Sequence, residues 1–238
     1  MEIAAKQMRD RLRKIYENYW PSLQDALLGR DDLKNRLGGP FLMDVCPEYF
    51  AAQKKLLIVG QQTKGWGNAW TQEAADDAIG FLMQIYAGFR LGENYLPTPF
   101  WAAAHQVYRK LNPAGPSYGF LWTNLVKVDQ DEGQPDAEVE EIVSAAFPVL
   151  PEEIEVVSPG IVVFFTGRYD HRLRRTFPGV RFEEVAGLPR KVLAKLVHER
   201  LPEPSYRTYH PSYFVRSSAT LCEHYAAMLS AIADGCIS

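Results

Sequence analysis

The sequence predicts an α/β fold, a three-layer α/β/α sandwich with a mainly parallel central sheet. Two observations predict it. Short apolar runs at 56–59, 120–126 and 161–165 are rich in the β-branched and aromatic residues that favour buried strands. Stretches in which apolar residues recur with a helical period separate these runs. Because strands that alternate with helices form parallel sheets, we expect helices on both faces of the sheet.

The N-terminal part of the chain has a helical pattern of apolar residues rather than alternating strand and helix patterns. Leu12 and Ile15 belong to a helical pattern of apolar residues, and Pro21 is expected to interrupt it. We therefore predict that residues 1–52 form a helical extension packed on the core, and that the α/β domain covers residues 53–238.

The remaining elements follow from the same two patterns. Thr71 is expected to cap the first helix of the domain, and Ser217 or Ser218 the last, because hydroxyl side chains favour the N-cap position. The predicted strands cover 56–59, 120–126, 161–165 and 180–185. The predicted helices cover 71–89, 100–111, 136–149, 190–200 and the stretch from Ser217 or Ser218 to Gly235, and residues 168–176 are expected to form a basic helix or turn.

Composition excludes several classes of protein. Of the 238 residues, 47% are apolar and 23% are charged, which allows a sizeable core and excludes an intrinsically disordered chain. No apolar run approaches the roughly 20 residues that span a membrane, and no apolar signal segment opens the chain. The three cysteines are widely spaced, which argues against a disulfide framework and against a cysteine-held metal cluster. We therefore expect a cytoplasmic protein with no membrane partner, and we expect it to be a monomer.

Charge is distributed unevenly along the chain. From residue 168 to residue 216, eleven Lys and Arg residues stand against five Asp and Glu residues. Such a basic stretch is typical of a surface that faces a polyanion, although solvated surface helices give the same pattern. The candidates for phosphate contacts are Arg168, Arg172, Arg174, Arg175, Arg207 and Arg216.

Polar side chains follow the ends of the predicted strands. They occupy residues 60–63, 123–124, 166–168 and 209–212. In open parallel sheets, ligands bind at the carboxyl ends of the strands, so these segments are candidates for one site. The alternative is that their Gln, Thr and Asn side chains only cap helices and close turns.

These segments resemble the motifs of the uracil-DNA glycosylase superfamily. Residues 57–65, Leu-Ile-Val-Gly-Gln-Gln-Thr-Lys-Gly, are similar to its first motif, an apolar strand that runs into Gly-Gln-Asp-Pro-Tyr-His or a variant. Residues 210–214, His-Pro-Ser-Tyr-Phe, are similar to its second motif, His-Pro-Ser-Pro-Leu, and residues 120–124 resemble its strand that ends in a uracil-reading Asn. The resemblance covers roughly 54–216. It implies a DNA-repair glycosylase that hydrolyses the N-glycosidic bond of a flipped, deaminated base, with nucleic acid as its partner and no cofactor.

The resemblance also implies a role for individual residues. His210 would donate a hydrogen bond to the base as negative charge develops on it, and Asn124 would read the edge of the base. Phe100, Trp66 and Trp70 are candidates for the ring that stacks on the base, and Phe214 is a candidate for the wedge that holds the duplex open. Each of these residues is otherwise a core aromatic. The other implied contacts to the base come from Gly60, Gln61 and Thr63, and those to DNA from Lys64, Ser212, Tyr213, Arg168 and Arg216.

One departure from the family pattern bears on catalysis. Gln62 stands where the family places a water-activating Asp, or an Asn in some branches. A Gln amide can orient a water molecule but cannot accept its proton at neutral pH. A second hypothesis is therefore a catalytically weak or inactive protein that binds nucleic acid or a nucleotide in the same cleft.

Overall fold

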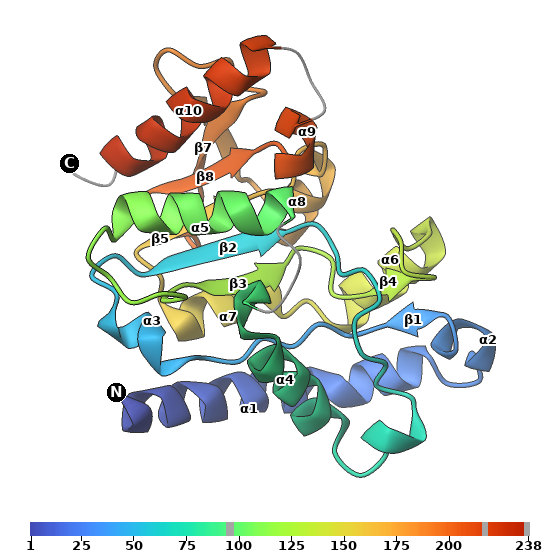
Figure 1. The fold of residues 1–238 in the computed structure, drawn as a ribbon. Helices are drawn as coiled ribbons and strands as arrows, with labels where there is room; N and C mark the ends of the chain where they lie inside the picture. Colours follow the sequence, from blue (N-terminus) through green and yellow to red (C-terminus); the bar gives the residue numbers. More distant parts are fainter. Residues whose placement is uncertain (94–97, 216–218, 236–238) are drawn as a thin grey trace.

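A six-stranded sheet forms the centre of the fold (Figure 1). The computed structural model describes residues 1–93, 98–215 and 219–235. The first four strands in the order below pair in parallel, and the last two join the sheet antiparallel. In spatial order the strands are β3 (Leu121–Asn124), β2 (Leu56–Gly60), β5 (Ile161–Phe164), β8 (Ser205–Thr208), β7 (Leu193–Val197) and β6 (Arg181–Glu184).

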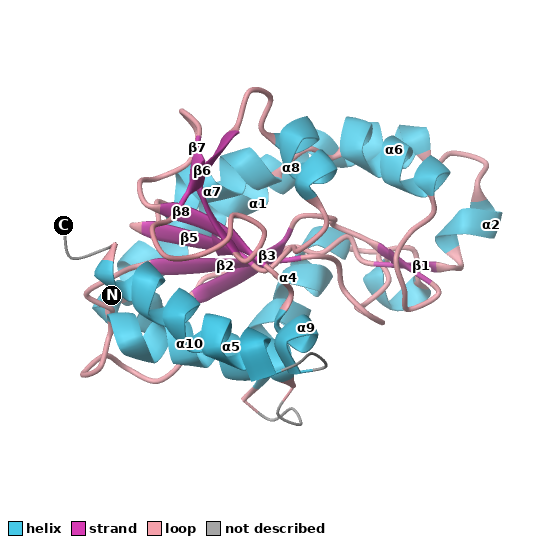
Figure 2. Cartoon of the chain, turned by 90° about the horizontal axis from the view of Figure 1, so that it is seen from above, coloured by secondary structure: helices cyan, strands magenta, loops and turns pink. Residues whose placement is uncertain are grey.

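Helices cover both faces of this sheet, which confirms the predicted α/β/α sandwich (Figure 2). One layer contains α1 (Glu2–Ala26), α6 (Ala137–Ala146), α7 (Leu150–Val157) and α8 (Asp170–Thr176). The other contains α5 (Pro99–Leu111), α9 (Pro211–Val215) and α10 (Ala219–Asp234). The connections carry α2 (Asp31–Lys34), α3 (Pro47–Ala51), the 3-10 turns η1 (Gln72–Ala74) and η2 (Arg90–Gly92), α4 (Ala78–Phe89) and the two-stranded ribbon of β1 (Leu37–Gly38) and β4 (Asp129–Gln130).

Helix α1 packs against α6 and α7 through an apolar face that includes Leu12, Ile15 and Leu23. These side chains belong to the same hydrophobic cluster as the strands of the sheet. The helix does not stop at Pro21, so that expectation was wrong. Proline removes the hydrogen bond to the carbonyl of Glu17 four residues earlier, but Glu17 and Pro21 are exposed, where water can take over that carbonyl.

The predicted helix over 190–200 is instead strand β7. It pairs antiparallel with β6 and with β8, for example Lys195 opposite Tyr206. Leu193, Ala194 and Leu196 are buried, and a strand buried on both faces shows no alternation of apolar and polar residues. The local pattern was therefore ambiguous, and pairing with distant strands determines the structure.

Helix α4 begins later than predicted. Asp77, not Thr71, caps it by accepting a hydrogen bond from the Gly80 N–H (2.9 Å). The Thr71 hydroxyl donates to the Asn68 carbonyl (3.1 Å), and only a 3-10 turn follows it. The predicted cap at residues 217–218 lies outside the described residues.

Candidate functional site

Most of the predicted site residues line one cavity at the carboxyl edge of the sheet. Its volume is about 350 Å³. Gly60 ends β2 and lies opposite Asn124, which ends β3. A Cβ on residue 60 would lie 2.3 Å from the Asn124 Oδ1, so the position of this carboxamide requires glycine. The predicted residues that line the cavity are Gly60, Gln61, Gln62, Thr63, Lys64, Phe100, Asn124 and His210.

The loop that follows β2 is held in place by its own side chains. The Gln61 Nε2 donates to the Thr166 carbonyl at the end of β5 (2.9 Å). The Thr63 hydroxyl donates to the buried carboxylate of Asp129 (2.6 Å), which also accepts the Trp66 backbone N–H (3.3 Å). Gln61 and Thr63 therefore shape the loop on which Gln62 lies. No local sequence signal pairs Thr63 with Asp129, 66 residues away.

Asn124 presents a hydrogen-bond donor to the cavity. Its side chain is buried, and its Oδ1 accepts from the Trp122 indole N–H (3.2 Å). Because an indole nitrogen can only donate, this contact fixes which end of the carboxamide is oxygen. The Nδ2 has no hydrogen-bond partner among the described residues. A bound ligand with an acceptor atom at this position would satisfy it.

His210 is oriented by the backbone of the next turn. The Ser212 N–H donates to the imidazole Nδ1 (3.3 Å). A nitrogen that accepts a hydrogen bond carries no proton, so the neutral ring holds its proton on Nε2. Phe100 stacks on the imidazole with the ring centroids 5.8 Å apart and the planes 26° apart.

An aromatic cluster forms the wall of the cavity. Trp122 is in contact with Trp101 (centroids 4.9 Å apart) and with Phe100 (6.0 Å). The indole nitrogen of Trp66 is buried and, like the Asn124 Nδ2, has no partner in the described structure. This wall keeps water away from one side of the cavity, which strengthens the electrostatic effect of the donors there.

Gln62 has a partner that the sequence did not suggest. Its Oε1 accepts a hydrogen bond from the Tyr169 hydroxyl (2.8 Å), 107 residues along the chain. The guanidinium of Arg172 lies over the Tyr169 ring, 3.7 Å from its centroid, and forms an ion pair with Glu140. Burial raises the pKa of Glu140, but Arg172 and Arg175 outweigh that effect and hold the pKa below its ordinary value. The carboxylate therefore stays charged and holds Arg172 in place.

Phe214 and Tyr213 are neighbouring predicted DNA contacts, but one is buried and the other is exposed. Phe214 is buried, only 4% exposed, and packs against Tyr209 and Tyr225. In this structure it is a core aromatic and not an exposed wedge, because α9 turns it toward α10. Tyr213, in the same motif, is 48% exposed, and Ser212 donates its backbone N–H to His210.

Several arginines that the sequence nominated for phosphates are used inside the protein. Arg172 is buried against Glu140, which also pairs with Arg175. Arg207 is buried and pairs with Asp170 (2.7 Å). Arginines whose charges are already compensated in this way are poor candidates for phosphate contacts. Arg168 and Arg174 are exposed, and Arg216 lies outside the described residues.

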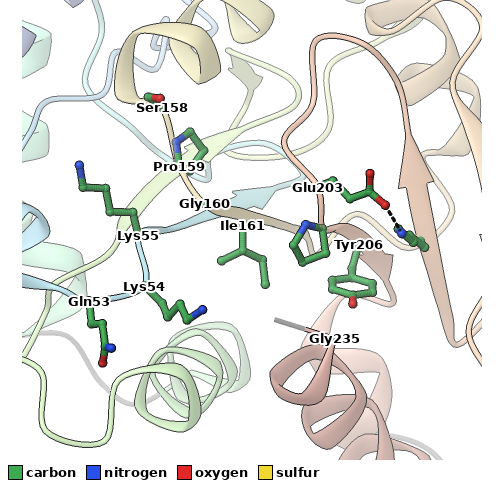
Figure 3. A pocket seen from close by; sticks show the side chains of 12 residues that line it. Gln53, Lys54, Lys55, Ser158, Pro159, Gly160, Ile161, Glu203, Tyr206 and Gly235 are labelled. Carbon is green, nitrogen blue, oxygen red and sulfur yellow. Dashed lines mark hydrogen bonds and ion pairs between the residues drawn. The ribbon is translucent and has the colours of Figure 1, made fainter. Parts of the chain in front are cut away.

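A larger cavity, about 830 Å³, lies at the opposite edge of the sheet (Figure 3). It is bordered by the residues that lead into β2 and β5 and by the end of α10 at Gly235. Lys54, Lys55 and Lys195 line it, and Lys195 forms an ion pair with Glu203. Its lining shares no residue with the carboxyl-edge cavity. Size alone therefore does not identify the site.

The family of the chain is indicated by comparison with known proteins. A family model described as the uracil DNA glycosylase superfamily matches residues 47–233, which include every segment of the carboxyl-edge cavity. No curated protein matches the sequence. Within the described ranges, no group of three or more His, Cys, Asp or Glu side chains is arranged to hold a metal ion. No helix in those ranges is long and apolar enough to cross a membrane.

Proposed function

Since the chain belongs to the uracil DNA glycosylase superfamily, we propose that it hydrolyses the N-glycosidic bond of a deaminated base flipped out of DNA into the carboxyl-edge cavity. The observation that carries the proposal is the buried Asn124 Nδ2, which lacks a partner in the described structure and lines the same cavity as His210. An unsatisfied buried donor costs about 1–3 kcal/mol. A base carbonyl relieves that cost, whereas an amino group there would set donor against donor. The cavity therefore favours a base in which a carbonyl has replaced an amino group.

The proposed chemistry depends on the departing base. Breaking the bond between C1′ and the base nitrogen leaves the electron pair on the base and positive charge on the sugar. In this proposal, the proton on the His210 Nε2 would stabilise a base oxygen as that charge develops. Water then adds to C1′ and loses its proton to solvent, because Gln62 cannot accept it. The reaction proposed here is therefore dissociative and proceeds without a general base at position 62.

Contacts to the DNA would come from the rim of the cavity. Tyr213 is the exposed aromatic residue of the second motif, so we assign to it the wedge role first expected of Phe214. Lys64 and Arg168 are exposed after β2 and β5, in positions to neutralise phosphates.

Single-turnover release of uracil, hypoxanthine and xanthine from single- and double-stranded DNA tests the proposal. The wild type should release at least one of these bases. His210→Ala should slow that release by about 10²–10³-fold, the usual effect of removing a donor to developing charge. Glu155→Ala is a control, because Glu155 is exposed on α7 and does not line the cavity. Failure of the wild type to release any of the three bases would overturn the proposal.

An alternative function is binding of nucleic acid or a nucleotide in the same cavity without efficient hydrolysis. The amide of Gln62 favours it, because the family's carboxylate is missing from this position. Tight binding of uracil-containing DNA with no base release would replace the glycosylase proposal by this one.

A further inference from the structure

Three carboxamides line the cavity, those of Gln61, Gln62 and Asn124, and in two of them the oxygen accepts a hydrogen bond from a neighbouring side chain. The Asn124 oxygen accepts from Trp122, and the Gln62 oxygen accepts from Tyr169. Tyr169 does not belong to the cavity lining. The Gln62 oxygen therefore points away from the ligand space, and its Nε2, which has no protein hydrogen bond within the described chain, is the end left to a ligand.

The direction of the Tyr169 hydrogen bond determines this orientation. A phenol has one proton to donate, and its oxygen lies 2.8 Å from the Gln62 Oε1 and 3.2 Å from the Gln134 Oε1. The shorter contact is the more buried one, since Gln134 is exposed and open to water. We therefore assign the phenol proton to Gln62, and the phenol oxygen can accept a hydrogen bond from the Gln134 carboxamide when its Nε2 faces the oxygen.

Tyr169 is fixed more firmly than an ordinary surface tyrosine. It is only 8% exposed, and its ring packs against the Arg172 guanidinium. Arg172 is itself buried and held by Glu140 through two of its nitrogens. Side chains of α6 and α8 thus set the phenol oxygen in one place. A group fixed in this way can hold a partner to a productive geometry.

We propose that Tyr169 is a positioning residue that presents the Gln62 Nε2 to the base as a hydrogen-bond donor. Gln62 then joins Asn124 and His210 in stabilising the departing base and does not direct the attacking water. As the C1′–N bond breaks, both of its electrons go to the base, and the three donors share the resulting charge. This inference rests on the proposed function and gives Gln62 a role opposite to that of the acid it replaces.

The test compares two leaving groups. The anion of 5-fluorouracil is more stable than that of uracil because fluorine withdraws electrons, so its departure needs less help from donors. Tyr169→Phe should slow uracil release by about twofold to tenfold, the worth of one hydrogen bond, and 5-fluorouracil release by less. Gln62→Ala should behave in the same way, and the double variant should be no slower than Gln62→Ala alone, because Tyr169 acts through Gln62.

Two controls separate this role from a structural one. Gln134→Ala removes the other contact of the Tyr169 hydroxyl and should leave both rates unchanged. Tyr49→Phe removes another buried phenol, bonded to the Val157 carbonyl (3.0 Å), and should leave the ratio of the two rates unchanged. Equal slowing of both substrates by Tyr169→Phe would overturn the inference, as would additive losses in the double variant.

Failure of the proposed function has a different signature. If the wild type releases neither base, binding replaces rate as the measurement, with duplex DNA that carries 2′-fluoro-2′-deoxyuridine, in which fluorine disfavours the sugar cation. Tyr169→Phe should then weaken binding of this duplex about twofold to tenfold and leave binding of the matched duplex with thymidine unchanged. Equal losses on the two duplexes would refute the donor role of Gln62 independently of any catalysis.

Discussion

Thr123 and Asn124 are consecutive residues of β3, and their side chains serve opposite faces of the sheet. Thr123 enters a closed network in which each polar group has a partner, whereas Asn124 ends in a cavity with an unused donor. Both side chains are almost completely buried. Burial of a polar residue therefore does not distinguish structure from function here. The distinction lies in whether the hydrogen bonds close within the protein.

The closed network joins three elements. Glu153 on α7 accepts from the Tyr16 hydroxyl of α1 and from the Thr123 hydroxyl, each at 2.9 Å. Lys127 donates to Glu153 (2.5 Å) and to Thr123 (2.6 Å). Burial and the charge of Glu153 raise the pKa of Tyr16 well above its usual value, so its hydroxyl remains a donor. The network fastens the N-terminal helix to the strand that carries Asn124.

The largest expected effect comes from breaking this network. Glu153→Ala leaves the Lys127 ammonium buried without its partner, which should lower the free energy of unfolding by about 3–5 kcal/mol. Urea denaturation of the wild type and the variant measures this loss in the free energy of unfolding. Glu155→Ala is the matched control, because its carboxylate is exposed and 3.6 Å from Arg200, and it should change stability by less than about 1 kcal/mol. Similar effects of the two variants would show that the network contributes no more than a surface pair.

The sequence predicted the strands that carry the site better than it predicted strand pairing and contacts between residues far apart in the chain. Buried strands at 56–59, 120–126 and 161–165 were visible because parallel strands are short apolar runs. Their common direction then brought Gly60, Asn124 and His210 to one cavity. Strand β7 was missed, because its partners are β6 and β8 and neither pairing has a local signal.

Contacts between side chains far apart in the sequence could not be predicted in the same way. The Tyr169–Gln62 hydrogen bond depends on how α8 packs on α6, which no motif encodes. Phe214 matches the family's wedge position by spacing, but its direction depends on the packing of α9 against α10. Arg172 was predicted to contact a phosphate, because its ion pair with Glu140, 32 residues away, has no signal in the sequence.

A smaller effect tests the two consecutive residues directly. Thr123→Val keeps the shape of the side chain but removes a partner of Lys127 and Glu153, so it should cost about 1–3 kcal/mol of stability and leave affinity for uracil-containing DNA unchanged. Asn124→Ala should instead weaken that affinity or slow base release. Denaturation and DNA binding, measured on both variants, show whether each residue contributes to stability or to ligand binding. If Thr123→Val is fully folded but no longer binds DNA, Thr123 cannot be assigned to the structural network alone.

The smallest effect on stability is expected at Asp77, which belongs neither to the closed network around Glu153 nor to the cavity. Asp77 caps α4 and pairs with Arg13 (2.9 Å), and both side chains are substantially exposed. The hydrogen bond from the Arg13 guanidinium holds the pKa of Asp77 below its ordinary value of 3.8; burial opposes this effect, and the Gly80 N–H adds to it. A carboxylate with a lowered pKa stabilises the fold above its ordinary pKa, and that stabilisation is lost as the pH falls through the lowered value. Asp77→Asn keeps the cap but removes the charge, so it should cost about 0.2–1 kcal/mol at neutral pH, and this cost should disappear in acid once the carboxylate is protonated. Denaturation curves at neutral and acidic pH measure the difference, and an equal cost at both would show that the cap geometry, rather than the charge, accounts for the stabilisation.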